Sequence, residues 1–217
     1  MMGEQRTLDA GTGGDTALYV VDYCEVIPSA SAEAAAQLRN YRDASRTQTG
    51  LGRLEVLQQR QRPNQFAIVA HWRDEQAFEA HAQAAHTQRL HNALRPLAVS
   101  PVDQRLHTAL VHGTASAAHT TGATYVVTHA DAIPPAKDDA MAALRQLAEA
   151  SRNDRGNIRF DVWQQRSRQN HFTLVEIWQD QQCLEAHVMA AHTRQFREVF
   201  QPMTGSLYDA RLYQALD

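Results

Sequence analysis

The sequence V-A-H-W-R-D-E-Q-A-F-E-A-H-A-Q-A-A-H-T at residues 69–87 returns as V-E-I-W-Q-D-Q-Q-C-L-E-A-H-V-M-A-A-H-T at residues 175–193. The two stretches begin 106 positions apart (175 − 69), and at this offset residues 19–110 align with 125–216 without a gap. About 40 of the 92 aligned positions are identical, far above chance for unrelated segments. The chain therefore contains an internal duplication, and the polar residues of one copy can be compared with those of the other.

The duplication sets the expected organisation of the 217 residues. We expect a disordered polar tail at 1–17, a first repeat at 18–111, a linker rich in Ala, Ser, Thr and Gly at 112–122, and a second repeat at 123–217. A domain of this size buries only about 60% of its unfolded surface and is marginal alone. We therefore expect each repeat to depend on its twin for stability.

Composition argues against several classes of partner. The chain has 21 Lys and Arg against 24 Asp and Glu, a net charge of −3 and a pI near 6.4, so no basic patch favours nucleic acid or an anionic membrane. The apolar runs are short and no charged-then-apolar leader is seen, so we expect a cytoplasmic protein. Cys24 and Cys183 occupy non-equivalent positions in the two copies, which predicts free thiols rather than a disulfide.

Each copy has the pattern strand, helix, strand, strand, helix, strand. The expected elements of the first copy, each with a counterpart 106 positions later, are a strand at 18–27, a helix at 30–46, strands at 53–60 and 65–72, a helix from Asp74 to about Pro96, and a strand at 103–110. Asp74 and Asp180 stand where helix N-caps belong. Gly50 and Gly156 stand where the preceding helix should stop.

The βαββαβ order is that of a ferredoxin-like α+β fold, with both helices on one face of a four-stranded antiparallel sheet. The other sheet face is left bare, and an apolar face must be buried. We predict that the two sheets pack face to face about a pseudo-twofold axis, making a barrel-like pseudo-dimer within one chain. The alternative is two independent domains on a linker, and further homo-oligomerisation is open.

A motif at the third strand and second helix of each copy points to a family. A strand ends in an acid, a spacer and Trp, and a His follows nine residues after the Trp, as in Glu176, Trp178 and His187. The first copy keeps Trp72 and His81 at the matching positions. The pattern resembles the signature of the antibiotic biosynthesis monooxygenase domains, and the resemblance covers nearly the whole of both repeats.

The resemblance implies a dimeric α+β barrel, here fused, with a substrate cavity between sheet and helices in each repeat. Some members of that family oxygenate polycyclic phenols, anthrones or quinols with O2 and no flavin, metal or haem. Such chemistry needs a base, hydrogen-bond donors for an oxyanion and flat apolar walls. The implied function is a cofactor-independent monooxygenase acting on a small aromatic or quinol-type molecule. The alternative is a non-catalytic small-molecule binding or stress-associated protein with the same barrel.

Four pairs of side chains, kept in both copies, are candidates for the site. His81 and His187 are candidates for the base or an oxyanion donor, or are bonded locally on their helices. Trp72 and Trp178 are candidates for walls against a planar ring, or are packing anchors. The remaining pairs, for which capping or a solvated charge is the alternative to substrate binding, are His86 with His192 and Arg60 with Arg166.

Differences between the copies point to the second repeat as the reactive one. If two strand faces coincide, His129 and Glu176 lie in one cavity, where the carboxylate orients the imidazole and raises its pKa. The first copy has Tyr23 and Ala70 there, so Tyr23 belongs to a binding surface of different chemistry. We hypothesise that catalysis resides mainly in the second repeat. The alternative is drift at positions without a role.

The 11 histidines raise the question of a metal or haem. His81, His86 and His91 are five residues apart, about 140° per step on one helix, so they should not share a face and we expect no metal site. Haem-degrading relatives place a haem-ligating His near His91, but the second copy has Arg197 there. Haem degradation is therefore the third and weakest alternative.

Overall fold

The computed structural model describes residues 16–113 and 122–216, so all but the last two residues of the predicted tail and most of the predicted linker lie outside the described residues. The first repeat contains β1 (Leu18–Glu25), α1 (Ser31–Ser45), β2 (Leu51–Gln59), β3 (Gln65–Trp72), α2 (Glu75–Ala82), α3 (Ala85–Leu94) and β4 (Asp103–Val111). The second contains β5 (Thr124–Asp131), α4 (Lys137–Ser151), β6 (Asn157–Gln165), β7 (His171–Trp178), α5 (Gln181–Val188), α6 (Ala191–Phe200) and β8 (Asp209–Ala215). Short 3-10 turns are η1 (Pro28–Ala30), η2 (Pro134–Ala136) and η3 (Gln201–Met203).

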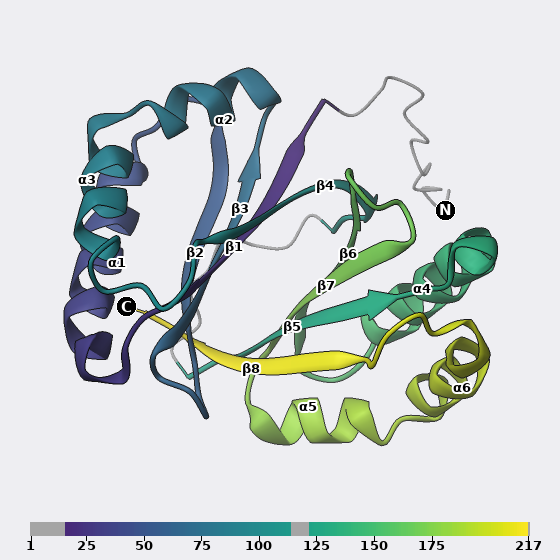
Figure 1. Ribbon diagram of the computed structural model, residues 1–217. Coiled ribbons are helices and arrows are strands. Elements are labelled where there is room, and N and C mark those ends of the chain that lie inside the picture. The colour runs from purple at the N-terminus through teal and green to yellow at the C-terminus, as the bar shows by residue number, and fades with distance from the viewer. Residues whose placement is uncertain (1–15, 114–121, 217) are drawn as a thin grey trace, which may run out of the picture.

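The eight strands form one closed antiparallel barrel in the order β1-β3-β2-β8-β5-β7-β6-β4, closed by β4 against β1. The helices of the first repeat lie on one side of the barrel and those of the second repeat on the other (Figure 1). The predicted pair of βαββαβ repeats and their fused barrel are confirmed. The sheets also join edge to edge, β2 with β8 and β6 with β4, which the sequence pattern did not reveal. These two seams leave no open sheet edge at β2 or β6.

The barrel interior is shared by both repeats. Its apolar cluster includes Tyr19, Val21, Leu57, Val69, Tyr125, Val127, Trp163, Val175 and Tyr213. Beside this cluster, buried Arg159 pairs with Glu55 of the first repeat at 2.8 Å and with Asp161 at 2.6 Å. Removing one partner would leave a buried charge uncompensated, so this triad also fixes how the repeats meet.

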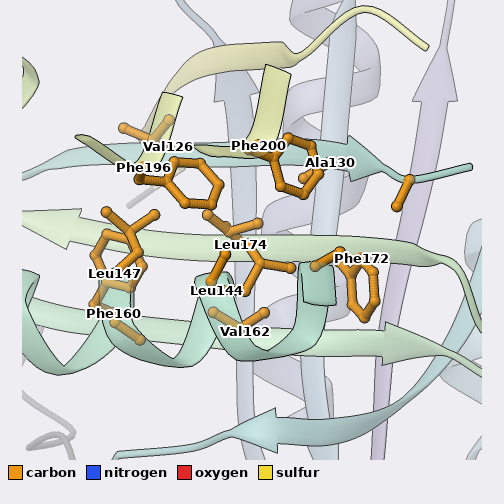
Figure 2. Packing of buried hydrophobic residues seen from close by; sticks show 14 of the residues in the cluster. Val126, Ala130, Leu144, Leu147, Phe160, Val162, Phe172, Leu174, Phe196 and Phe200 are labelled. Carbon is orange, nitrogen blue, oxygen red and sulfur yellow. The ribbon is translucent and has the colours of Figure 1, made fainter. Parts of the chain in front are cut away.

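The opposite face of each half-barrel packs against its own helices. In the second repeat, residues from β5, β6 and β7 meet α4 and α6 in one cluster (Figure 2), which includes Val126, Phe160, Phe172, Leu174, Leu144, Leu147, Phe196 and Phe200. A matching cluster in the first repeat includes Leu38, Phe66, Ile68, Leu90 and Leu94. Alternate strand residues thus serve two different layers, barrel interior and helix-facing side. None of the described helices has the length and apolar character needed to cross a membrane.

The predicted second helix of each repeat is in fact two helices. Ala84 has an extended backbone with ψ of 145°, which separates α2 from α3, and Ala190, with ψ of 151°, separates α5 from α6. The predicted N-caps are confirmed. The side chains of Asp74 and Asp180 accept backbone N–H groups three residues on, at 2.7 and 2.8 Å.

Gly50 and Gly156 do not stop the preceding helices, which end at Ser45 and Ser151. Both glycines have positive φ, 81° and 76°, in the turn that enters the next strand. A Cβ at Gly156 would also overlap the side chain of Cys183 on α5. Glycine is therefore needed for close approach of this turn to the helix, and the interpretation as a helix stop is wrong.

Candidate active site

Each repeat encloses a cavity between the helix-facing side of its sheet and its helices, and the two differ greatly in volume. The second cavity measures ≈ 400 Å³, within the ~300–1,000 Å³ typical of small-molecule sites. Its wall is mostly apolar, and its polar lining includes Thr128, Glu176, Gln181, His187, Arg197 and Tyr208. The first cavity measures ≈ 50 Å³ and adjoins a surface groove of ≈ 540 Å³. The cavity lined by the shared histidine is therefore the larger one in the second repeat.

His187 on α5 lines the larger cavity and is held on two sides. Its ring stacks on that of Trp178, with centroids 4.6 Å apart and 26° between planes. Its Nδ1 lies 2.8 Å from Oδ2 of Asp154, in the turn after α4, so the carboxylate keeps the imidazole proton on Nδ1. Within the described residues Nε2 has no hydrogen-bond partner. Nε2 is therefore the nitrogen available to take a proton from a bound molecule.

Electrostatics favour the neutral form of this imidazole. Burial lowers the pKa of His187 below its ordinary value of 6.5, and the hydrogen bond with Asp154 opposes the shift only in part. His187 is thus uncharged at neutral pH, which is the form that a general base requires.

Glu176 on β7 brings a second titratable group to the same cavity. Its side chain is buried, and Trp178 Nε1 donates to Glu176 Oε2 at 2.9 Å. Burial raises the pKa of Glu176 from 4.5 to about 7, while the hydrogen bond from Trp178 acts in the opposite direction. Near neutral pH this carboxyl exists in both protonation states, so it can donate as well as accept a proton.

The two tryptophans occupy matched positions with different surroundings. Trp178 is fully buried beneath His187 and does not line the larger cavity, so it is a packing anchor that orders His187 and Glu176 rather than a wall. Trp72 lines the small first cavity. Its buried Nε1 has no hydrogen-bond partner in the described part of the chain, because Ala70 stands where the second repeat has Glu176.

His81 in the first repeat is bonded through the other nitrogen. Its Nε2 lies 2.7 Å from the hydroxyl of Tyr41, and its ring is 4.5 Å from that of Trp72. Burial, with smaller contributions from neighbouring histidines, lowers the pKa of His81 to about 4. The second repeat has Leu147 in place of Tyr41. The same histidine is therefore engaged in one repeat and available in the other.

His86 and His192 lie near the starts of α3 and α6, and neither lines its repeat's main cavity. His192 Nε2 is 3.1 Å from the Asp154 oxygen that also contacts His187. The sequence argument against a metal site assumed that histidines five residues apart lie on one continuous helix. It does not apply to His187 and His192, because α5 ends and α6 begins between them. Among the described residues, Asp154, His187 and His192 form a group that could hold a metal ion, since their donor atoms all lie within 4.8 Å of one another.

The expected pairing of His129 with Glu176 is wrong. Glu176 is paired across the strands with Val126 and faces the helices, whereas His129 is paired with Thr173, one position out of phase, on the opposite face. Paired residues share a face and neighbours along a strand alternate, so His129 points into the barrel. There it lies 3.2 Å from Arg105 Nη1, and its ring centroid is 5.2 Å from that of half-buried Tyr23. Neither His129 nor Tyr23 lines the cavities under the helices.

The arginine pair lines neither cavity and connects the repeats instead. Arg60 donates to Gln181 at 3.2 Å and to Thr124 at 2.9 Å, both in the second repeat. Arg166 pairs with Glu75 of the first repeat at 3.1 Å, the symmetric counterpart of the contact with Gln181. These arginines therefore form symmetric contacts between the two repeats across the pseudo-twofold axis.

Sequence reasoning missed Asp154 and Tyr41, which set the roles of the two histidines. Neither is kept in the other copy: Gln48 matches Asp154, and Leu147 matches Tyr41. The available signal at both positions is a difference between the two copies that lies outside the strands. Asp154 lies in a turn, and a turn has no sequence periodicity that would indicate which side chain points toward the site.

The haem alternative is confined to the first repeat. His91, at the expected ligand position, lines both the ≈ 50 Å³ cavity and the adjoining ≈ 540 Å³ groove of that repeat. The larger cavity has Arg197 at the matching position, and guanidinium has no lone pair to offer to iron.

Fold and site together define a class: a fused pair of α+β barrel repeats with a helix-covered cavity and a hydrogen-bonded Asp–His pair. The model of the antibiotic biosynthesis monooxygenase family matches residues 17–93 and 124–199, most of both repeats. The chain therefore belongs to the antibiotic biosynthesis monooxygenase family, as its motifs predicted.

Solved structures share the fold across both repeats. A "putative monooxygenase" from Fusobacterium nucleatum superposes with a TM-score of 0.86 at 15% identity, covering 94% of each chain. A second, from Lactobacillus acidophilus, gives 0.78 at 12% identity, covering 93% of this chain and 95% of that one. An "anthrone oxidase-like protein" gives 0.71 at 16% identity, covering 93% and 92%. No curated protein sequence matches the chain significantly.

Proposed function

We propose that the chain is a monooxygenase that oxygenates a small aromatic, quinol-type or polycyclic phenolic compound with O2 and no bound cofactor, in the cavity of the second repeat. The observation that carries the proposal is the Asp154–His187 pair, with a neutral imidazole at the cavity wall and Nε2 available. The volume of ≈ 400 Å³ and the mostly apolar wall suit a planar molecule. Family membership supports the reaction class, and the neighbour named anthrone oxidase-like supports the substrate class.

Proton removal is the first step. An anthrone-type methylene or a phenol is acidic because its anion is delocalised over the rings. Nε2 of His187 takes the proton, and the Asp154 carboxylate stabilises the resulting imidazolium. A positioned base of this kind contributes ~10²–10⁴-fold to the rate. The apolar wall then keeps the anion away from water. An anion without a hydration shell is a better electron donor than a hydrated one.

The substrate supplies every electron in the reaction. The carbanion adds to O2 and, after protonation, gives a hydroperoxide on the same carbon. His187, neutral again once the peroxide is protonated, removes the second proton of that carbon while the O–O bond breaks and hydroxide leaves. A carbonyl results, so CH2 and O2 become C=O and H2O, with one oxygen atom in each product. The protonated form of Glu176 is available near neutral pH to protonate the departing hydroxide. Arg197 lines the same cavity and can stabilise the negative oxygen that forms.

A screen of anthrones and hydroquinones for O2 uptake tests the proposal, with protein-free samples correcting for autoxidation. For an anthrone we expect one O2 consumed per carbonyl product, with one labelled atom in the product when 18O2 is used. Label that enters from H218O instead would contradict the mechanism. Tight binding of several such compounds without any O2 uptake would favour a non-catalytic binding protein.

A further inference from the structure

We propose that Asp154, His187 and His192 form a binding site for a first-row divalent transition-metal ion such as Zn²⁺ or Co²⁺ in the second repeat. The three side chains come from the turn after α4, from α5 and from the start of α6. Oδ2 of Asp154 lies 2.8 Å from His187 Nδ1 and 3.1 Å from His192 Nε2. Two imidazoles and one carboxylate are a donor set that suits zinc and non-haem iron. The inference concerns binding alone and does not depend on the proposed oxygenase reaction.

The separations of the donor atoms fit a coordination sphere. Ligands at about 2.1 Å from a metal, with angles between those of an octahedron and a tetrahedron, lie about 3.0–3.4 Å from each other. The 2.8 and 3.1 Å distances are close to this range, and all three donor atoms fall within 4.8 Å. Modest side-chain movement therefore admits the ion, and three protein ligands leave at least one position for water.

Two of the ligands are held in place by their surroundings. The His187 ring is stacked on Trp178. The turn that carries Asp154 is fixed by two backbone hydrogen bonds, from Asp154 N–H to the carbonyl of Ser151 and from Asn157 N–H to the carbonyl of Asp154, each 3.1 Å long. Orientation by surrounding groups of this kind commonly strengthens metal affinity.

Two of the three side chains are partly exposed, although the donor atom His192 Nε2 is itself buried. The side chains of Asp154 and His192 are 23% and 26% exposed, and His192 lines a hollow of ≈ 200 Å³ between α4 and α6. An ion can therefore arrive without unfolding the helices.

The first repeat is an internal control for the donor set. It keeps the two histidines, with His86 Nε2 3.3 Å from His81 Nδ1, but has Gln48 where the second repeat has Asp154. A neutral amide is a weaker ligand than a carboxylate for such ions. The inference therefore assigns a metal to the second repeat alone.

Metal binding would change what His187 offers to the cavity. The ion takes the lone pair of Nδ1, and the imidazole stays neutral because its proton moves to Nε2. Nε2 then donates a hydrogen bond and no longer accepts a proton. The metal-loaded protein and the general base are thus mutually exclusive states of one side chain.

Titration of the chelator-treated full chain with Co²⁺, followed by its visible ligand-field absorption, tests the inference, and calorimetry with Zn²⁺ gives the stoichiometry. We expect one tight equivalent per chain. Asp154→Asn and His192→Ala should each weaken binding roughly tenfold or more, as loss of one ligand from a three-ligand site does. The matched first-repeat variant His86→Ala should bind like wild type.

Wild-type affinity and an unchanged Co²⁺ spectrum in both Asp154→Asn and His192→Ala would overturn the inference. So would an equal loss in His86→Ala. Thermal melts of each variant establish that it is folded, and His192→Ala changes a partly exposed side chain, so at least one informative variant should fold. No substrate enters the experiment, so its outcome is independent of the oxygenase proposal.

Discussion

The cavities of the two repeats differ although both are built on the same Trp, His and His side chains. In the second repeat the cavity measures ≈ 400 Å³ and His187 is anchored through Nδ1. In the first it measures ≈ 50 Å³ and His81 is engaged through Nε2. The side chains shared by the copies build the frame, and those that differ decide whether the histidine is available for chemistry.

Three exchanges account for the contrast, and each acts through a different physical effect. Replacing tyrosine by leucine removes the hydroxyl that engages Nε2. Replacing glutamine by aspartate provides the charge that fixes the proton on Nδ1. Replacing alanine by glutamate places a carboxyl with a raised pKa beside the buried tryptophan. The exchanges, first repeat to second, are Tyr41 to Leu147, Gln48 to Asp154 and Ala70 to Glu176.

The largest effect among the supporting positions is expected at Asp154. In Asp154→Asn the ring loses the anion that selects its tautomer and stabilises the imidazolium, so we expect O2 uptake to fall by about 10²-fold, part of what a positioned base supplies. The matched variant Gln48→Asn should retain its rate. Comparable losses in both variants would mean that the turn matters for folding rather than for the base.

The next effect concerns stability against pH. The pKa of Glu176 is about 7 in the folded state and ordinarily 4.5. Between pH 4.5 and about 7 the folded protein therefore retains a proton on Glu176 that the unfolded chain has lost. Stability should fall as pH rises through this window, by up to about 3 kcal/mol. Glu176→Gln should remove the fall. Asp22→Asn should remove a similar fall at lower pH, because burial raises the pKa of Asp22 from 3.8 to about 6.

Denaturant unfolding of wild type, Glu176→Gln and Asp22→Asn from pH 4 to 8 measures these differences. Taking each variant relative to wild type cancels the titration of all other groups. A wild-type curve parallel to that of Glu176→Gln across the whole range would show that Glu176 has an ordinary pKa.

A smaller effect is expected from exchanging the residue that engages Nε2. Leu147→Tyr should place a hydroxyl against His187 and reduce the cavity, lowering kcat/KM by roughly tenfold, as loss of one positioned group does. In the reverse variant, Tyr41→Leu, His81 loses its partner at a cost of about 1–3 kcal/mol and the first cavity should grow. Kinetics and calorimetric ligand stoichiometry measure the two effects. Unchanged kinetics in Leu147→Tyr would contradict a role for this part of the cavity in the reaction.

The fold was readable from the sequence because duplication and alternation are both repeated over many residues. The caps at Asp74 and Asp180 were also readable, since an N-cap depends only on neighbours three residues away. The break between paired helices was not, because an alanine such as Ala84 carries no local signal for an extended backbone.

The site was readable only in part. Its shared histidines and tryptophans were found from the two copies, whereas the partner Asp154 comes from a turn whose position depends on packing. The pairing of His129 with Glu176 failed because alternation gives the face of each strand but not the register between strands. A shift of one residue put the two side chains on opposite sides of the sheet.

The central claim is that the second repeat carries the base. Oxygen uptake by His187→Ala and His81→Ala, normalised to folded protein, tests it most directly. We expect His187→Ala to lose about 10²–10⁴-fold in rate, the usual contribution of a general base, and His81→Ala to stay close to wild type. Equal losses in the two variants would contradict the asymmetry, and an undiminished rate in His187→Ala would contradict the assignment of the base.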